Sequence, residues 1–411
     1  MKAIENALNK VKPNFESGGK LELLWPMFEG METFLLTPDH KTHQGAHIRD
    51  RMDLKRLMVF VDFALLPCVL FACWNIGYQA ELAEGGSSGD ILWQFARGLR
   101  HFMPLYMVTA MVGGTWELLF CVVRKHEINE GFLVTSLLFP LICPPTLPLW
   151  MAAMGISFGV VIGKEVFGGV GFNILNPALT ARAFVFFTYP AYISGAKTAD
   201  GLGVWTAAGR WMPGAETVLP VDGFTGATPL LAVSNGDSGS YAIDILNEHQ
   251  WGFWELFNGM IPGSMGETST LAVLFGAVFL IATGIASWRI MVGCALGLLA
   301  VTSLFYFGVD ATGADFNPLM TIPPHYHLVM GGFAFGAVFM ATDPVSAAVT
   351  RPGRWMYGIS IGVLCGLVRV VNPAYPEGMM LAILFMNVFA PLLDYYVVKA
   401  STRRRAARLA S

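Results

Sequence analysis

The sequence predicts an all-α polytopic membrane protein of about ten transmembrane helices. Of its 411 residues, 54% are hydrophobic and only 13% are charged, which is too apolar for a soluble globular protein. Apolar stretches of about 17 to 25 residues, the length that crosses a bilayer, recur along the chain. Lysine and arginine gather at the two ends, as in membrane proteins whose basic segments stay in the cytoplasm.

Net charge and cysteine content argue against two classes of function. The formal net charge of −3 indicates no strongly charged partner such as nucleic acid. The six cysteines lie in apolar runs without metal-ligand spacing, so we interpret them as packing residues and expect no metal site.

Residues 1–56 form a predicted cytoplasmic segment before the first span. The segment starts with polar residues and lacks the apolar stretch of a signal peptide, and it carries nine lysines and arginines. Pro26 is expected to begin a short helix that ends at Thr37. This helix either lies on the inner membrane surface or caps the bundle, and the two are compatible.

Ten stretches are predicted to cross the membrane, five in residues 57–190 and five in residues 270–398. They are Leu57–Gly77, Phe102–Val123, Phe132–Trp150, Met151–Gly163, Ile174–Pro190, Thr270–Ser287, Ile290–Phe307, Leu328–Thr342, Trp355–Val371 and Met379–Val398. Several are short or broken by proline. Irregular backbone at membrane depth is tolerated only where protein buries it or where it lines a cavity, so the broken spans indicate a site.

The distribution of basic residues predicts the orientation. Residues 399–411 form a basic tail, and together with residues 1–56 they put both termini in the cytoplasm. An even number of spans satisfies this, and the same topology counts Lys164 among the inner-loop charges. The part of the chain from 191 to 250 contains only Lys197 and Arg210, so residues 191–269 are expected to form a periplasmic loop.

The two sets of spans resemble each other. Gly155 to Gly163 reads GISFGVVIG and Gly358 to Gly366 reads GISIGVLCG, and Asn-Pro-Ala occurs at both 176 and 372. These matches predict two parallel five-helix repeats, an arrangement in which sites form at the repeat interface. Chance similarity between glycine-rich helices is the alternative.

The predicted outer loop contains the motif Asp222-Gly-Phe-Thr225-Gly226-Ala227-Thr228. Such a sequence by itself indicates only a turn with exposed hydroxyl groups. Its position in the long outer loop of a ten-span protein favours a functional role for the motif over a simple turn.

Several further blocks point to one family. They are Val112-Gly-Gly-Thr-Trp-Glu117, Arg124-Lys-His-Glu-Ile-Asn-Glu-Gly131, Gly163-Lys-Glu-Val-Phe-Gly-Gly169, Asn173-Ile-Leu-Asn-Pro-Ala178, Pro262-Gly-Ser-Met-Gly-Glu-Thr-Ser269, Ala341-Thr-Asp-Pro-Val-Ser346 and Asn372-Pro-Ala-Tyr-Pro-Glu-Gly378. With them the chain resembles the NqrB/RnfD family of membrane subunits, found in sodium-translocating NADH:quinone oxidoreductases and ferredoxin-linked Rnf ion pumps. The long segment 1–56 favours the quinone-reductase branch.

This resemblance implies two flavins. A flavin transferase esterifies the phosphate of FMN to the last hydroxyl of the family's motif, which is Thr228 here. Asp222, Thr225, Gly226 and Ala227 complete that motif. The family also holds a noncovalent riboflavin within this subunit, and the resemblance implies a urea-transporter-like fold in the bacterial inner membrane.

Amide and hydroxyl groups near the membrane supply further flavin contacts. Pro262 to Thr270 is expected to be a turn that runs into a helix, and its free N–H groups and the side chains of Ser264 and Glu267 suit FMN. A simple helix cap is the alternative. Asn173 and Asn176 carry amides that need partners in lipid, and we expect them to contact riboflavin.

Two acids lie within predicted spans. A carboxylate is costly inside a bilayer, so Glu117 and Asp394 are candidates for sodium uptake, a role that the family resemblance also implies for Glu117. Glu117 is alternatively the end of a helix near the inner surface. Asp394 is alternatively structural, paired with a basic neighbour.

The resemblance places quinone near Gly113 and Gly114. The aromatic residues Phe132, Phe184 and Phe186 are further candidates to line a quinone channel, although phenylalanines at such spacing usually belong to a hydrophobic core.

The resulting hypothesis is a translocase subunit in a multi-subunit complex. It passes electrons from covalent FMN through riboflavin to ubiquinone and couples this to Na⁺ export. No glycine-rich dinucleotide motif follows a strand, so NADH oxidation is expected on a partner subunit. The alternatives are an Rnf-type subunit and, in another class, a passive solute channel.

Overall fold

The computed structural model describes residues 10–15, 19, 21, 25, 28, 32, 54–86, 89–124, 131–193, 205–207, 226–309, 316–372 and 375–410. Over these residues the chain is helical and has no strand. Of the helix expected between Pro26 and Thr37, only Phe28 and Glu32 are described, and both are helical. The motif residues Asp222 and Thr225 lie outside the described residues.

The first half of the bundle contains five α-helices. They are α3 (Leu54–Ala83), α4 (Ile91–Arg124), α5 (Gly131–Leu141), α6 (Leu149–Val161) and α7 (Pro177–Thr188), with short 3₁₀ turns at η3 (Glu165–Phe167) and η4 (Pro190–Tyr192). Asn176 caps α7, and Pro177 occupies its first position, where the missing N–H of proline costs nothing.

The second half is less regular. It contains α11 (Thr270–Ala282), α12 (Trp288–Gly308), α13 (Phe333–Phe335), the π-helix η8 (Gly336–Met340), α14 (Arg351–Val371) and α15 (Met379–Ala410). Ser269 and Thr350 cap α11 and α14 through their hydroxyl groups.

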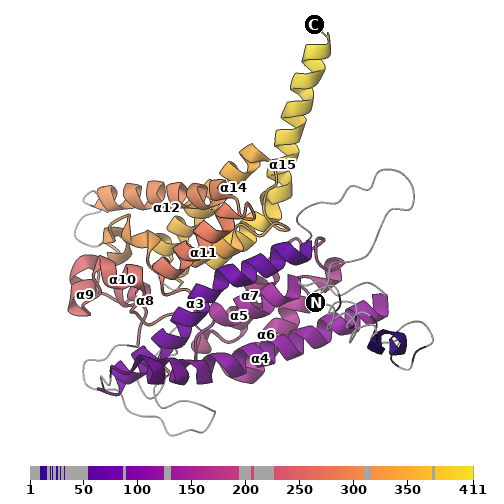
Figure 1. Cartoon of the computed structure of the whole chain (residues 1–411). Coiled ribbons are helices and arrows are strands. Elements are labelled where there is room, and N and C mark those ends of the chain that lie inside the picture. Colours follow the sequence, from indigo (N-terminus) through magenta and orange to yellow (C-terminus); the bar gives the residue numbers. More distant parts are fainter. Residues whose placement is uncertain are drawn as a thin grey trace.

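A separate group of short helices joins the two halves in sequence. It comprises α8 (Pro229–Ser234), α9 (Ala242–Glu248) and α10 (Phe253–Asn258), at one end of the bundle (Figure 1). These helices pack on η6 (Pro318–Thr321) and η7 (Tyr326–Leu328). Their buried apolar residues form a cluster distinct from the main core: Leu230, Val233, Ala242, Leu246, Trp251, Leu256, Ile261, Leu319, Ile322, Val329 and Met330.

The prediction of a polytopic membrane protein agrees with this fold. In the described part of the chain, six helices are long and apolar enough to cross a membrane: Arg56–Ala83, Ile91–Arg124, Leu149–Phe167, Trp288–Gly308, Arg351–Val371 and Met379–Leu409. Each of the ten predicted stretches contains helix, but ten full spans are not confirmed. Helices α5 and α11 are shorter apolar helices, and the stretch from 328 to 342 is divided among η7, α13 and η8.

Glycine allows two helix pairs to approach closely. A Cβ atom at Gly98 of α4 would lie 1.7 Å from the carbonyl oxygen of Cys73 in α3. One at Gly362 of α14 would lie 2.0 Å from the carbonyl oxygen of Cys294 in α12. Small residues at such crossings are typical of helix packing in membranes.

The glycines matched between the two halves face different neighbours. Gly155 and Gly159 in α6 face α7, whereas Gly358 and Gly362 in α14 face α12. The motif match alone therefore does not establish a structural repeat.

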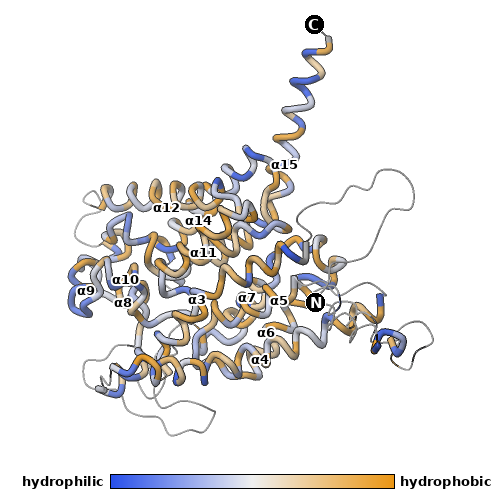
Figure 2. The backbone as a smooth tube through the Cα atoms, in the orientation of Figure 1, coloured by the Kyte–Doolittle hydropathy of each residue, from blue (hydrophilic) through white to orange (hydrophobic). Residues whose placement is uncertain are grey.

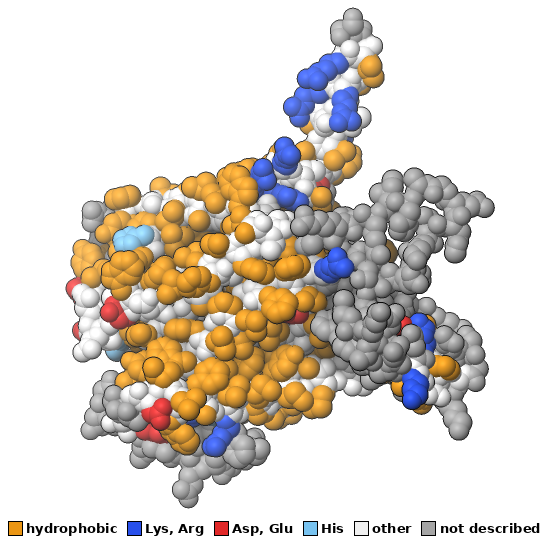
Figure 3. All heavy atoms as spheres, in the orientation of Figure 1, with side chains coloured by type: hydrophobic (Ala, Val, Ile, Leu, Met, Phe, Trp, Pro, Cys, Tyr) orange, Lys and Arg blue, Asp and Glu red, His pale blue; other side chains and the backbone are white. Residues whose placement is uncertain are grey.

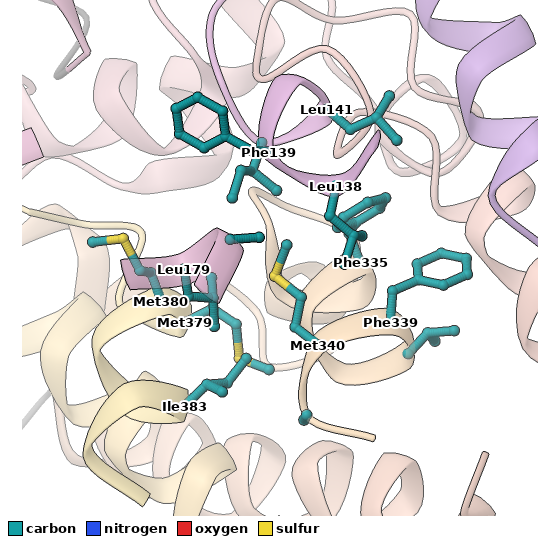
Figure 4. Packing of buried hydrophobic residues seen from close by; sticks show 14 of the residues in the cluster. Leu138, Phe139, Leu141, Leu179, Phe335, Phe339, Met340, Met379, Met380 and Ile383 are labelled. Carbon is teal, nitrogen blue, oxygen red and sulfur yellow. The ribbon is translucent and has the colours of Figure 1, made fainter. Parts of the chain in front are cut away.

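The short helices meet in the centre of the molecule. Figure 4 shows side chains from α5, α7, α13, η8 and α15 converging there: Leu138, Phe139, Leu141, Leu179, Phe335, Phe339, Met340, Met379, Met380 and Ile383. All six cysteines are buried free thiols, as their interpretation as packing residues predicts.

The surface has the distribution expected in a bilayer. Hydrophobic residues run through the bundle and cover much of the face in view, and charged groups gather towards its ends (Figures 2 and 3). The end of α15 projects from the bundle and carries basic side chains (Figures 1 and 3).

Candidate functional site

A small cavity lies between the two halves. Its walls come from α3, α5, the start of α7, the end of α11 and the residues around η8. Its volume is about 60 Å³, which holds a few water molecules and is well below the roughly 300–1,000 Å³ of small-molecule sites. The lining is mainly apolar, and its polar side chains are Thr135, Lys164, Asn173, Asn176, Thr342 and Asp343.

Both asparagines predicted to contact riboflavin line this cavity. The amide nitrogen of Asn173 donates to the carbonyl of Leu175 at 3.0 Å. Oδ1 of Asn176 accepts from the N–H groups of Ala178 and Leu179 at 3.0 and 3.3 Å. These hydrogen bonds fix the two side chains. They involve neither Oδ1 of Asn173 nor Nδ2 of Asn176.

Four charged side chains meet near the C-terminal end of α4. Lys164 donates to Oε1 of Glu117, and its Nζ is also 3.8 Å from Oε1 of Glu165. Arg124 donates to the carbonyl of Glu165 at 2.6 Å and lies 3.7 Å from its Oε2. Glu117, Lys164 and Glu165 are 3, 2 and 1% exposed, so this network is buried. Lys164, expected among the inner-loop charges, is thus an interior ion-pair partner.

A second buried network holds the turn before α11. Arg182 of α7 donates to Oε1 of Glu267 at 2.9 Å and to Oγ of Ser264 at 3.4 Å. Glu267 presses against Gly332, where a Cβ atom would lie 2.4 Å from its Oε1. The N–H of Gly332 donates to Oε2 of Glu377 at 2.9 Å. The predicted turn is therefore present, but Ser264 and Glu267 contact an arginine that the sequence did not single out.

Thr228, the predicted FMN attachment residue, is the N-cap of α8. Its Oγ1 accepts from the N–H of Leu231 at 3.3 Å, and the residue is 7% exposed. Leu230 in the same helix reaches Gly331, where a Cβ atom would lie 2.7 Å from Cδ1 of Leu230. The helix that Thr228 caps thus packs on the backbone that contacts Glu267 and Glu377.

The residues predicted to contact quinone fall into two groups. In one, Gly113 of α4 packs on Phe132 of α5. In the other, Phe184 and Phe186 extend from α7: Phe184 stacks on Phe158 with ring centroids 4.6 Å apart, and Phe186 meets Tyr375 at 4.5 Å.

The neighbouring glycines of α4 predict different mutant effects. A Cβ atom would lie 2.4 Å from the ring of Phe132 at Gly113, but 3.5 Å from it at Gly114. We expect Gly113→Ala to lower the thermal stability of the complex, because a ring must shift in a packed interior. Gly114→Ala should leave stability and flavin content unchanged and alter quinone or inhibitor affinity. Steady-state quinone kinetics and melting curves check this, and unaltered quinone kinetics in Gly114→Ala would move the quinone site elsewhere.

Asp394 anchors α15 to the start of α14. Its Oδ2 accepts from the N–H of Val349 at 2.7 Å, and its Oδ1 accepts from the N–H of Thr350 at 3.0 Å and from the Thr350 hydroxyl. The structural role of Asp394 thus comes from hydrogen bonds with backbone and hydroxyl groups, and not from pairing with a basic neighbour. Its role in sodium uptake stays a prediction.

We expect Asp394→Asn to lower the stability of the complex by about 1–3 kcal/mol, because an amide NH₂ replaces one acceptor and leaves an N–H unpaired. The sodium dependence of the surviving molecules then decides its role: a purely structural carboxylate leaves it as in the wild type, and a carboxylate that takes up sodium raises the sodium requirement. Melting curves and sodium titrations of quinone reduction, normalised to bound flavin, test this. A raised sodium requirement at unchanged stability would instead assign Asp394 to ion binding.

The structure adds site residues that sequence reasoning missed. These residues belong to the buried networks or line a second, very small cavity of about 10 Å³ beside Arg182 and Glu267: Arg182, Glu165, Tyr375 and Glu377. The sequence signal that could have found them is a charged residue within an apolar segment. Placing such a charge inside a membrane costs free energy, so the residue needs a partner or has a function.

The fold and these buried groups define a polytopic helical membrane protein with a small cavity between its two halves and charges paired inside its bundle. Comparison with known proteins gives the family. The chain belongs to the NQR2, RnfD, RnfE family, whose model matches residues 41–403. The family expected from the sequence blocks is thereby confirmed.

Individual relatives cover nearly the whole chain. It is 49% identical over 423 residues to the B subunit of the Na(+)-translocating NADH-quinone reductase of Stutzerimonas stutzeri (strain A1501), with 98% of each chain covered. Identity is 50% over 424 residues to the protein of that name from Azotobacter vinelandii (strain DJ / ATCC BAA-1303), again with 98% of each covered. The Yersinia pestis protein of the same name is 48% identical over 433 residues, covering 98% of this chain and 99% of the relative. With its membrane-capable helices, the chain is a multi-pass bacterial membrane protein.

Proposed function

We propose that this chain is the membrane subunit of a redox-driven sodium pump. It passes electrons from a covalent FMN through riboflavin to ubiquinone and couples this transfer to Na⁺ export. The observation that carries the proposal is the near-full-length similarity to proteins named as the B subunit of a Na(+)-translocating NADH-quinone reductase. NADH oxidation is assigned to another subunit of the complex.

FMN is proposed on the hydroxyl of Thr228, within the motif that also contains Asp222, Thr225, Gly226 and Ala227. The position of Thr228 at the end of the bundle that carries α8 to α10 supports this (Figure 1). FMN supplies the electron-transfer chemistry when bound, and the chain supplies position and exclusion of water. Contacts of FMN with Ser264 and Glu267 are proposed next to it, since Leu230 and Glu267 pack on the adjacent glycines 331 and 332.

Riboflavin is proposed at the cavity between the two halves, whose walls would have to separate to admit it, since the cavity volume is about 60 Å³. The apolar wall suits a flat aromatic ring system, and the unused amide groups of Asn173 and Asn176 suit its polar edge. Lys164 adds a positive charge to the same wall. The chemistry of the lining, and not the present size of the cavity, supports this proposal.

Quinone is proposed near Gly113, Gly114 and Phe132, with Phe184 and Phe186 as further candidates. Glu117 and Asp394 are the candidates for sodium uptake. Burial of Glu117 among charged partners supports its candidacy, because carboxylate oxygens are the ligands that hard cations prefer.

The proposed architecture has ten transmembrane segments in two five-helix repeats with a urea-transporter-like arrangement and both termini in the cytoplasm. It is supported by helix in all ten predicted stretches and by the basic end of α15. Partner subunits, a flavin transferase during maturation and the lipid of the inner membrane complete the environment.

Two rivals remain testable. An Rnf-type subunit shares the same family description, so the family match alone does not separate it. A passive solute channel fits the broken spans but needs no flavin.

The purified complex tests the proposal in two steps. On a denaturing gel, the band of this chain should fluoresce as a flavin, and a dark band would favour a channel. The native complex should then reduce a ubiquinone analogue with NADH at a rate that sodium increases. Fluorescence without sodium-stimulated quinone reduction would favour the Rnf-type alternative.

A further inference from the structure

We propose that one buried water molecule binds between the hydroxyl group of Tyr375 and the carboxylates of Glu267 and Glu377. The site lies where α7, the turn before α11 and the segment before α15 meet. It depends neither on the proposed flavins nor on sodium transport. It also gives a role to the sequence block from Asn372 to Gly378, to which the proposed function assigns none.

The cavity beside Arg182 has the volume of one water molecule. It measures about 10 Å³, and a cavity needs roughly 10–15 Å³ to hold a water. Its polar lining consists of Arg182, Glu267, Tyr375 and Glu377, and the rest of its wall is apolar or glycine. Apolar cavities stay dry, whereas a polar cavity of this size holds water that bonds to otherwise unpaired groups.

Two of these side chains end in a buried polar atom that has no hydrogen-bond partner among the described residues. The atoms are Oε2 of Glu267 and the hydroxyl oxygen of Tyr375. The two residues are only 6 and 7% exposed, so bulk solvent does not reach them. Leaving such atoms unpaired costs free energy, and one ligand in the cavity that both line can bond to both.

The two carboxylates lie against the same pair of glycines. A Cβ atom at Gly332 would lie 3.0 Å from Oε2 of Glu267, and a Cβ atom at Gly331 would lie 2.8 Å from Oε2 of Glu377. The N–H group of Gly332 donates to that same Oε2 of Glu377 at 2.9 Å, a bond that does not use Oε1. The acids are thus near neighbours, and each has an oxygen left to accept a hydrogen bond.

Water matches the hydrogen-bonding capacity of the three groups. The hydroxyl group of Tyr375 donates to the water oxygen, and the two water hydrogens go to Oε2 of Glu267 and Oε1 of Glu377. A sodium ion would instead repel the hydroxyl hydrogen and the guanidinium of Arg182, which is bonded to Glu267 at 2.9 Å. The chemistry of the lining therefore favours water over a cation.

The water makes Tyr375 a positioning residue for the ion pair of Arg182 and Glu267. Arg182 holds Oε1 of the carboxylate, and the water holds Oε2. A buried charge is stabilised when all its oxygens are hydrogen-bonded. Through this water, α7 of the first half is joined to the segment that leads into α15.

Cryo-EM of the complete complex, at a resolution that shows ordered water, tests the site directly. We expect one peak about 2.5–3.0 Å from the hydroxyl oxygen of Tyr375 and from one oxygen of each carboxylate, the range of O–H···O hydrogen bonds. An empty cavity would overturn the inference. So would a Tyr375 hydroxyl that bonds directly to Glu267 or Glu377.

Tyr375→Phe removes the donor but keeps the ring, so the melting temperature of the complex should fall. Tyr357→Phe is the matched control for a lost hydrogen bond, because the Tyr357 hydroxyl lies 2.6 Å from the amide of Asn387, and it should fall by a similar amount. Tyr189→Phe alters a half-buried tyrosine outside the cavity and should melt as wild type. An unchanged or raised melting temperature in Tyr375→Phe would show that its hydroxyl has no partner, contrary to the inference.

Melting in NaCl and in choline chloride at equal ionic strength separates water from sodium. The difference between Tyr375→Phe and wild type should be the same in both salts. A difference that appears only in NaCl would identify the occupant as a cation and reject the water. If Tyr375→Phe does not assemble, the wild-type map decides the question.

Discussion

Thr228→Ala is expected to yield a chain that assembles into its complex but carries no covalent flavin. The proposed ester forms with the hydroxyl group of Thr228, and the methyl side chain of alanine cannot form it. Loss of the N-cap of α8 costs about 1 kcal/mol, which the apolar cluster beneath that helix tolerates. In-gel fluorescence should vanish, and electron transfer to quinone should fall to background.

Two other substitutions serve as controls for this result. Thr228→Ser retains a hydroxyl that caps α8 and accepts an ester, so flavin should remain. Thr225→Ala should also retain it. Peptide mass spectrometry locates the flavin, and FMN found on Thr225 or another residue would refute the assignment.

Arg182→Met should prevent or strongly reduce assembly of the complex. The guanidinium is 5% exposed and is the charged partner of Glu267, which is 6% exposed. Removing one member of a buried ion pair typically costs about 3–5 kcal/mol, because the other charge stays buried. Yield after detergent extraction and the melting temperature of any remaining complex measure the effect.

A double substitution separates charge from packing. Arg182→Met/Glu267→Met removes both charges and should recover much of the lost yield. Arg97→Met provides an arginine control, since Arg97 is 19% exposed and its pair with Glu84 should contribute no more than about 1 kcal/mol. Wild-type stability in Arg182→Met would show that Glu267 is uncharged or differently paired.

Local sequence signals predicted much of the fold. The length of the apolar stretches predicted ten helical segments, and each of the ten contains helix. The turn from Pro262 to Thr270 leads into α11 as expected. Capping residues followed by proline, as at Asn176 and Thr228, mark where α7 and α8 begin. These features depend on residues close in sequence, which a pattern can register.

Interruption of helices was harder to predict. The apolar stretch from 328 to 342 reads as a span, yet Gly331 adopts a positive φ of 64° and a π-helix follows at η8. Composition records that such a segment is apolar, but not that neighbouring helices bury its irregular backbone.

The pairing of buried charges could not be read from sequence at all. Lys164 and Glu117 are 47 residues apart, and Arg182 and Glu267 are 85 apart. An acid in a span signals only that a partner or function is required. Glu117 was therefore singled out, whereas its lysine partner was assigned to a loop.

The separate apolar cluster under α8 to α10 has a thermodynamic consequence. A segment that opens locally loses the free energy of its own contacts and not that of the whole molecule. Opening these helices would disrupt the cluster around Leu230 and Trp251 while the main core stays packed. Thr228, 7% exposed when the segment is closed, then becomes reachable by a modifying enzyme. Reclosure of the segment would shield the proposed flavin ester from hydrolysis.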